Sequence, residues 1–107
     1  MSGIHGIRRS PADAKFSREI RERDRYTCQR CSAIHLENSQ GLHAAHMFTR
    51  RTQATRFDPD NAMALCYGCH QFADSHSAEK EALFRARLGD EAFEALAARA
   101  HGKRDRP

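Results

Sequence analysis

Two C-x2-C pairs constrain the folding of this chain more than any other feature of its sequence. Cys28 and Cys31 form the first pair, Cys66 and Cys69 form the second, and 34 residues separate them. Each pair can form a tight turn that presents two thiolates, and four thiolates complete the tetrahedral shell of one structural zinc ion. A zinc ion bound in this way contributes on the order of 10 kcal/mol to folding. We therefore predict a fold built around a zinc site.

The size and composition of the chain agree with this prediction. A chain of 107 residues without Trp and with a mean hydropathy of -0.80 buries little apolar surface, and small domains of this kind often depend on a metal or on disulfides. The N-terminus lacks an apolar signal segment, and no stretch is long enough to span a membrane. We expect a cytoplasmic protein, where structural disulfides are disfavoured. Redox-active dithiols and unlinked buried thiols are the alternatives for the four cysteines.

Local patterns predict an α+β domain. Ser10 caps and Pro11 begins a helix that runs to about residue 25,. Short strands are expected over residues 42–48 and 62–65, and further helices begin near residue 66 and cover residues 78–88 and 90–99, with Gly89 between the last two,. The expected organisation is a flexible N-terminus over residues 1–10, a single domain over residues 11–100 and a frayed basic tail over residues 101–107.

Basic residues are concentrated in the first half of the chain. Residues 1–56 hold 11 Lys or Arg against 5 Asp or Glu, whereas residues 57–107 hold 7 against 9. Fifteen of the 18 basic residues are Arg, whose planar guanidinium matches phosphate with two hydrogen bonds and stacks on bases. This distribution favours nucleic acid as the partner over a merely solvated basic surface.

The segment between the cysteine pairs carries histidines and an asparagine in a characteristic order. His43 and His46 come first, Asn61 follows, and His70 stands directly after the last cysteine. Together with the sequences RDRYTC before the first pair and FDPDN before the second strand, this order resembles the HNH endonucleases, in particular phage recombination nucleases of the NinG-like type. The resemblance covers residues 25–70 and extends more weakly to residue 96.

The resemblance implies a ββα-metal, treble-clef-like domain that hydrolyses phosphodiester bonds of duplex or branched DNA with a divalent cation. His46 would be the general base that takes a proton from the attacking water. Asn61 would hold the His46 ring in its productive orientation or, as in some variants of the family, approach the metal. His70 would bind the ion at the scissile phosphate. Such hydrolysis needs a base near neutral pH, a cation for the developing charge and a group that fixes the base. The resemblance also implies a phage or prophage protein in a bacterial host.

The chain departs from the family at one position. Many HNH enzymes place an acidic metal ligand directly before the base, where this chain has Ala45. The resemblance implies that His43 replaces this acid as a metal ligand. Positions 43 and 46 share a strand face only if a bulge or turn intervenes. A histidine ligand favours Mn2+, Ni2+ or Zn2+ over Mg2+.

Arg50, Arg51 and Arg56 follow the predicted base and are expected to contact the phosphate backbone without reading bases,. A solvated loop is the alternative for these three residues. For the chain as a whole, the alternative to a nuclease is a zinc-stabilised DNA-binding module without catalysis, acting like the nuclease as a monomer or weak homodimer.

Overall fold

The first helix begins where the sequence predicts it. The computed structural model describes residues 9–102, and in it α1 covers Pro11–Arg23. The Ser10 hydroxyl accepts a hydrogen bond from the backbone N–H of Asp13, and the Asp13 carboxylate accepts one from the backbone N–H of Ser10. This reciprocal pair satisfies two donors that the helix leaves unpaired at its start. The helix ends slightly earlier than expected, because Arg25 and Tyr26 adopt positive φ angles of 58° and 55°.

Two short strands form an antiparallel hairpin. Strand β1 covers Leu42–His46 and β2 covers Ala62–Cys66, with the register running from Leu42 opposite Cys66 to His46 opposite Ala62. The long connection between them contains two single-turn 3-10 helices, η2 (Gln53–Thr55) and η3 (Pro59–Asn61). The strands therefore lie where the sequence places them.

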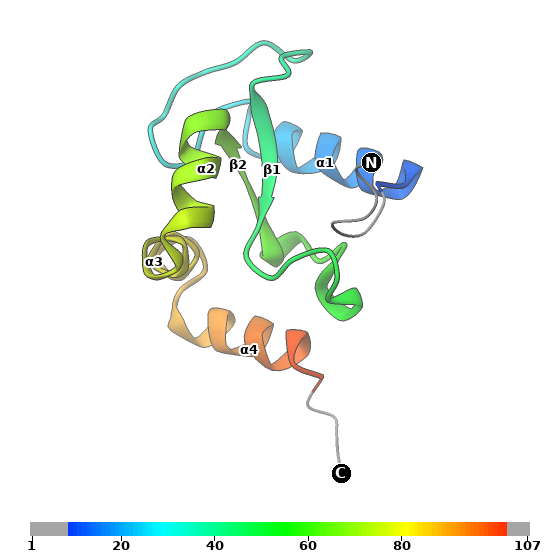
Figure 1. Cartoon of the computed structure of the whole chain (residues 1–107), viewed down its shortest axis with the longest axis vertical. Coiled ribbons are helices and arrows are strands. Elements are labelled where there is room, and N and C mark those ends of the chain that lie inside the picture. The colour runs from blue at the N-terminus through cyan, green and yellow to red at the C-terminus, as the bar shows by residue number, and fades with distance from the viewer. Residues whose placement is uncertain (1–8, 103–107) are drawn as a thin grey trace.

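Three helices follow the hairpin: α2 (Tyr67–Ser75), α3 (Ser77–Leu88) and α4 (Asp90–Ala100). Gly89 joins the last two with a φ of +88°, a conformation that residues with a Cβ rarely adopt,. The part of the chain that the structure describes thus forms a small α+β domain with four α-helices and one hairpin (Figure 1).

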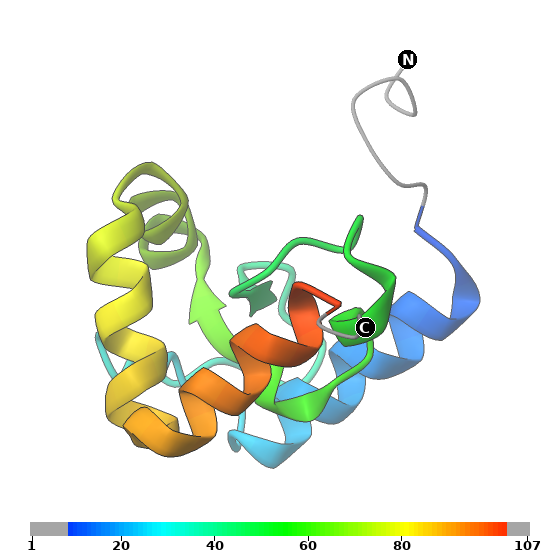
Figure 2. The same ribbon diagram turned by 90° about the horizontal axis from the view of Figure 1, so that it is seen from below.

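The hairpin lies between α1 on one face and α2 on the other, and α4 passes below it (Figures 1 and 2). On the face toward α1, Phe16 and Ile20 pack against Ala62 and Ala44. On the opposite face, a larger buried cluster joins the two strands to the later helices. Its members include Ala45, Met63, Leu65, Phe84 and Phe93. The alternation of Ala44 and Ala45 between these clusters is the two-residue period of a strand covered on both faces.

A buried carboxylate ties the elements together. Asp24, directly after α1, accepts hydrogen bonds from the backbone N–H of Ala64 at 2.8 Å and from the Arg87 guanidinium at 2.8 Å. Burial raises the pKa of Asp24, but its bonds to Arg23 and Ala64 and the charge of Arg87 outweigh burial and leave that pKa below its usual value,. Asp24 therefore fixes the end of α1 against β2 and α3.

No helix within residues 9–102 is long and apolar enough to cross a membrane. The expected flexibility of residues 1–8 and fraying of residues 103–107 lie outside the described residues.

Candidate functional site

The four cysteines come together as the sequence predicts. The Sγ atoms of Cys28, Cys31, Cys66 and Cys69 all lie within 4.8 Å of one another. Those of Cys31 and Cys66 are 3.8 Å apart, which is about the edge of a tetrahedron of sulfurs bound to zinc at 2.3 Å. Neither pair forms a disulfide. The cluster is consistent with a structural zinc ion, and it joins the loop after α1 to the start of α2.

The surroundings of Cys28 favour its thiolate, whereas burial and the neighbouring thiols raise the pKa of Cys69 to about 12. Burial raises the pKa of the Cys28 thiol, but backbone N–H groups of Cys31, Cys66 and Arg30 outweigh burial and bring that pKa to about 6. Arg30 also donates a hydrogen bond to Cys69 Sγ, at 3.4 Å, while its guanidinium lies 3.9 Å from the centre of the Phe72 ring. A thiolate is the form that binds metal, so Cys28 is prepared to bind it at neutral pH.

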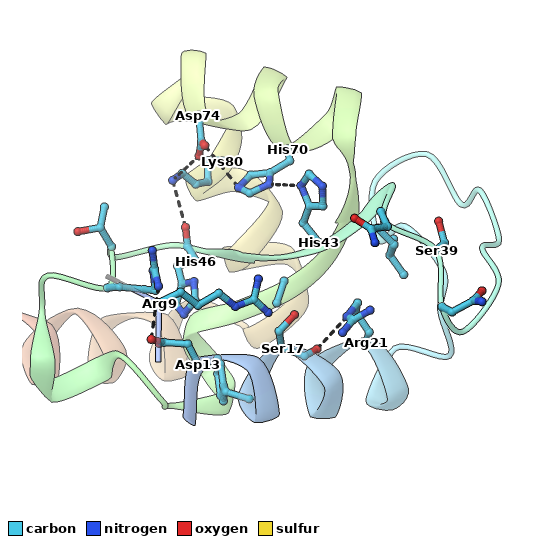
Figure 3. Close-up of a pocket in the computed structure, with 17 residues that line it drawn as sticks. Arg9, Asp13, Ser17, Arg21, Ser39, His43, His46, His70, Asp74 and Lys80 are labelled. Atoms are coloured by element: carbon cyan, nitrogen blue, oxygen red, sulfur yellow. Dashed lines mark hydrogen bonds and ion pairs between the residues drawn. The ribbon is translucent and has the colours of Figure 1, made fainter. Parts of the chain in front are cut away.

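A groove of about 730 Å3 runs between α1 and α2 along the unpaired edge of β1 (Figure 3). Its lining includes all three histidines that the sequence singles out, His43, His46 and His70. His43 faces α2, where its ring contacts His70, and His46 faces α1, where its ring lies 5.6 Å from that of Phe16. The strand has a regular register with no bulge, so the two histidines lie on opposite faces of it. Both still reach the groove, because the groove follows the edge of the strand.

His43 and His70 form a close pair within this groove. Their Nδ1 atoms are 2.8 Å apart. On its other side, His70 Nε2 lies 3.4 Å from the carboxylate of Asp74, one helical turn further along α2. A carboxylate accepts hydrogen bonds only, so Asp74 favours the proton on Nε2 and leaves the Nδ1 lone pair directed at His43. Burial lowers the pKa of His70, which keeps the ring neutral and able to bind a cation,.

Lys80 links Asp74, which lies beside His70, to the backbone of His46. Its Nζ donates to Asp74 Oδ1 at 3.1 Å and to the backbone carbonyl of His46 at 3.1 Å (Figure 3). Asp74 and Lys80 were not singled out from the sequence. The spacing of four between His70 and Asp74 was the available signal, because residues four apart on a helix are neighbours.

His46 is held by the backbone of the long connection between the strands. Its Nε2 lies 3.1 Å from the carbonyl oxygen of Arg56. A carbonyl oxygen cannot donate, so Nε2 carries the proton and Nδ1 is the basic nitrogen of the neutral ring. Burial lowers the pKa of His46, and the bond to Arg56 only partly opposes this effect. The ring therefore stays neutral at pH values where an exposed histidine begins to protonate.

Asn61 bonds to the backbone of this connection instead of the His46 ring. Its fully buried amide accepts from the backbone N–H of Phe48 at 2.8 Å and donates to the carbonyls of Phe48 at 2.8 Å and Thr55 at 3.0 Å. The expected direct contact with His46 is thus replaced by an indirect one. Asn61 fixes Thr55, and the carbonyl of the next residue, Arg56, holds His46.

The three arginines of the connection occupy different environments. Arg51 is exposed, and Arg50 lines the groove, where its Nη1 lies 3.4 Å from Asp13 Oδ2. Arg56 corrects the sequence expectation: its side chain is buried and both its Nε and Nη2 donate to Asp13. It cannot serve as a surface contact to phosphate while this ion pair is intact. The same bonds hold the pKa of the Asp13 carboxyl well below its usual range.

The comparisons with known proteins give no match. No family model, no curated protein and no solved structure matches the chain.

Proposed function

We propose that this chain is a metal-dependent DNA endonuclease of the HNH type, in which His46 is the general base and His43 with His70 holds a catalytic divalent cation. The observation that carries the proposal is the hydrogen bond of the His46 ring, which gives its two nitrogens different roles. Nε2 is committed to the carbonyl of Arg56, which leaves Nδ1 as a base in a groove that also contains a pair of histidine nitrogens. Phosphodiester hydrolysis needs both of these parts.

The histidine pair fits a divalent cation of the Mn2+, Ni2+ or Zn2+ type. Two imidazole nitrogens bound to one such ion at 2.0–2.1 Å lie roughly 3 Å or more apart, so a small outward movement from 2.8 Å is sufficient. Within residues 9–102, the four cysteines are the only group of three or more His, Cys, Asp or Glu side chains that could hold a metal ion. His43 and His70 thus leave most coordination positions open for phosphate oxygens and water. When bound, the ion would stabilise the charge that develops on the scissile phosphate.

The remaining residues of the site have supporting roles in this proposal. His46 accepts the proton of the attacking water at Nδ1, and the Arg56 carbonyl stabilises the imidazolium through Nε2–H,. Asn61 is a positioning residue, since it holds the connection that supplies this carbonyl. Arg50 supplies positive charge beside the path of the DNA, and exposed Arg51 adds charge on the surface nearby,. The four-cysteine zinc site fixes α2, and with it His70, against the hairpin.

Cleavage of supercoiled plasmid tests the proposal. Zinc-loaded protein is assayed with EDTA, Mg2+, Mn2+, Ni2+ or Zn2+, beside His46→Ala and a matched control, His35→Ala, whose ring does not line the groove. We expect metal-dependent nicking that falls about a hundredfold to ten-thousandfold in His46→Ala and is unchanged in His35→Ala. Binding of DNA without cleavage under any ion would instead identify a zinc-stabilised, non-catalytic binding module.

A further inference from the structure

We infer that the groove takes a DNA strand whose bases are unpaired next to the scissile phosphate, with Tyr67 as a stacking platform for one of those bases. The inference rests on the proposed nuclease function and names the substrate class for the same site. It derives from the placement of exposed aromatic side chains beside the two histidines, together with the charge of the groove.

Exposed aromatic rings occur next to the site. Within residues 9–102, the exposed large apolar side chains are Ile34, Leu36, Phe57 and Tyr67. Tyr67 is 58% exposed, and its ring meets that of His43 edge to face at 6.0 Å. Of the two aromatic members, Tyr67 contacts a histidine of the site directly and Phe57 does so only through Phe16, whereas the two aliphatic members lie on the loop before β1.

Phe57 has the corresponding position on the other side. It is 44% exposed and packs edge to face on Phe16 at 5.9 Å, and Phe16 in turn lies 5.6 Å from His46. An aromatic ring is therefore open to solvent on the α2 side of His43 and another on the α1 side of His46.

Packing does not account for the position of the Tyr67 side chain. The backbone N–H of Tyr67 bonds to the carbonyl of Gly41, which fixes the start of α2 without the ring. Apart from its chain neighbours, nothing lies within 4 Å of the place where a Cβ of the adjacent Gly68 would stand, so the first turn of α2 is uncovered there. A flat ring that is 58% exposed can accept another flat ring.

The groove carries the charge that a nucleic-acid backbone needs. Four basic side chains line it, Arg9, Arg21, Arg50 and Lys80, against two carboxylates, Asp13 and Asp74. Arg50 pairs with Asp13 near the start of α1, and Arg21 stands two helical turns later at the end near Ser39 (Figure 3). Eight residues of helix span roughly 12 Å, a length over which a DNA strand presents more than one phosphate.

A cationic track with exposed aromatic rings is the arrangement that binds single strands. In an intact duplex, neighbouring bases already cover both faces of each base, so a side chain can stack only on a base that is unpaired or extruded. The position of Tyr67 beside His43 therefore favours single-stranded DNA, a flap or the strand next to a branch point over continuous duplex. Arg21 and Arg50 would hold the phosphates of that strand on either side of the histidines.

Binding measurements separate this inference from the nuclease proposal. The zinc-loaded His46→Ala protein is titrated into a single-stranded oligonucleotide with one 2-aminopurine, whose fluorescence is quenched by stacking, and into the matching duplex. We expect tighter binding of the single strand, with quenching. Tyr67→Leu should weaken single-strand binding by about 5- to 150-fold, the range of one base–aromatic stack of 1–3 kcal/mol, and should abolish the quenching without changing duplex affinity.

Two further variants make the result specific. Tyr67→Phe keeps the ring and should retain both affinity and quenching. Leu36→Ala removes an apolar side chain that is 78% exposed and does not line the groove, and it should also retain both. If Tyr67→Leu loses zinc, Phe57→Leu provides the equivalent test on the other side. Equal affinity for single strand and duplex, or equal behaviour of Tyr67→Leu and Leu36→Ala, would overturn the inference. Absence of plasmid cleavage alone would overturn only the nuclease proposal.

Discussion

The Nδ1 atoms of His43 and His70 lie 2.8 Å apart, although the residues are 27 positions apart and belong to a strand and a helix. Two nitrogens at this distance must share one proton or one cation, since two lone pairs or two N–H groups would repel each other. Asp74 lies beside the outer nitrogen of His70 and so orients the ring of that residue alone. In the proposed function, a metal ion would take the place of the shared proton.

Replacing His70 with Ala should remove the second metal ion and leave the zinc. The wild-type chain is expected to bind one zinc at the cysteines and one Mn2+ or Ni2+ at the histidines. His70→Ala should retain the zinc and lose the second ion, because His43 alone supplies a single ligand. Isothermal titration with Mn2+ or Ni2+ and metal analysis measure the two ions separately, with His35→Ala as the control. An unchanged titration in His70→Ala would show that the ion binds elsewhere.

The rate of cleavage should begin to fall on acidification only below about pH 6.5. Burial lowers the pKa of His46, so the neutral, basic form persists to lower pH than in an exposed histidine,. At saturating metal, kcat/KM should be level from about pH 8 to 6.5, the usual pKa of histidine, and fall below it. A rate that already declines on acidification above pH 6.5 would contradict the role of a buried His46.

The same burial predicts how stability depends on pH. The rings of His46 and His70 have lower pKa values when folded than when unfolded, so the unfolded chain binds more protons below about pH 6.5,. Their contribution to the free energy of unfolding is complete above that pH and is lost as the pH falls through the folded values. Unfolding curves of zinc-loaded protein between pH 8 and 5 measure this loss, which should be smaller in His46→Gln.

Local chemistry made much of the fold predictable. Ser10, Pro11 and Asp13 begin α1 through bonds within four residues of sequence, and Gly89 separates α3 from α4 through its own backbone freedom. The cysteine spacing was equally informative, because each C-x2-C pair forms a turn by itself and zinc chemistry requires four ligands,.

Long-range partners could not be read from the sequence. Arg56 stands among basic residues and was expected at the surface, but it is buried against Asp13, 43 residues earlier. Nothing near either residue indicates this pairing, since it depends on how the connection between the strands lies over α1. Asn61 was expected to hold the His46 ring, but it bonds to Phe48 and Thr55, and these bonds depend on the same arrangement.

Asn61→Ala should destabilise the domain more than a substitution at an exposed asparagine. The change leaves the N–H and carbonyl of Phe48 and the carbonyl of Thr55 without their side-chain partner, and Asn61 is fully buried. Leaving such a group unsatisfied costs about 1–3 kcal/mol, so a loss of at least that size is expected in urea denaturation of zinc-loaded protein. Asn38→Ala, at an exposed position, is the control and should change the free energy of unfolding by less than about 0.5 kcal/mol,.

Removal of zinc should abolish cooperative folding. A structural zinc site contributes on the order of 10 kcal/mol, which is comparable with the roughly 5–15 kcal/mol total stability of a natural domain. The four-cysteine cluster joins the loop after α1 to the start of α2, so without metal these two segments would lose the ion that holds them together. A chelator that removes zinc, or Cys28→Ser, should eliminate the thermal unfolding transition seen by circular dichroism, whereas Ser32→Ala should preserve it.

The same experiment decides between the zinc site and the redox alternative for the cysteines. All four thiols are free in the structure, whereas an oxidised redox pair would join the two sulfurs of one C-x2-C motif at about 2.05 Å,. A structural zinc predicts one tightly bound ion per chain and thiols that react with a thiol reagent only after chelation. A redox dithiol predicts no bound zinc, rapid thiol reaction before chelation and a fold that survives the chelator. Metal analysis of the purified protein followed by thiol titration distinguishes the two, and a stable, zinc-free fold would contradict the structural zinc site.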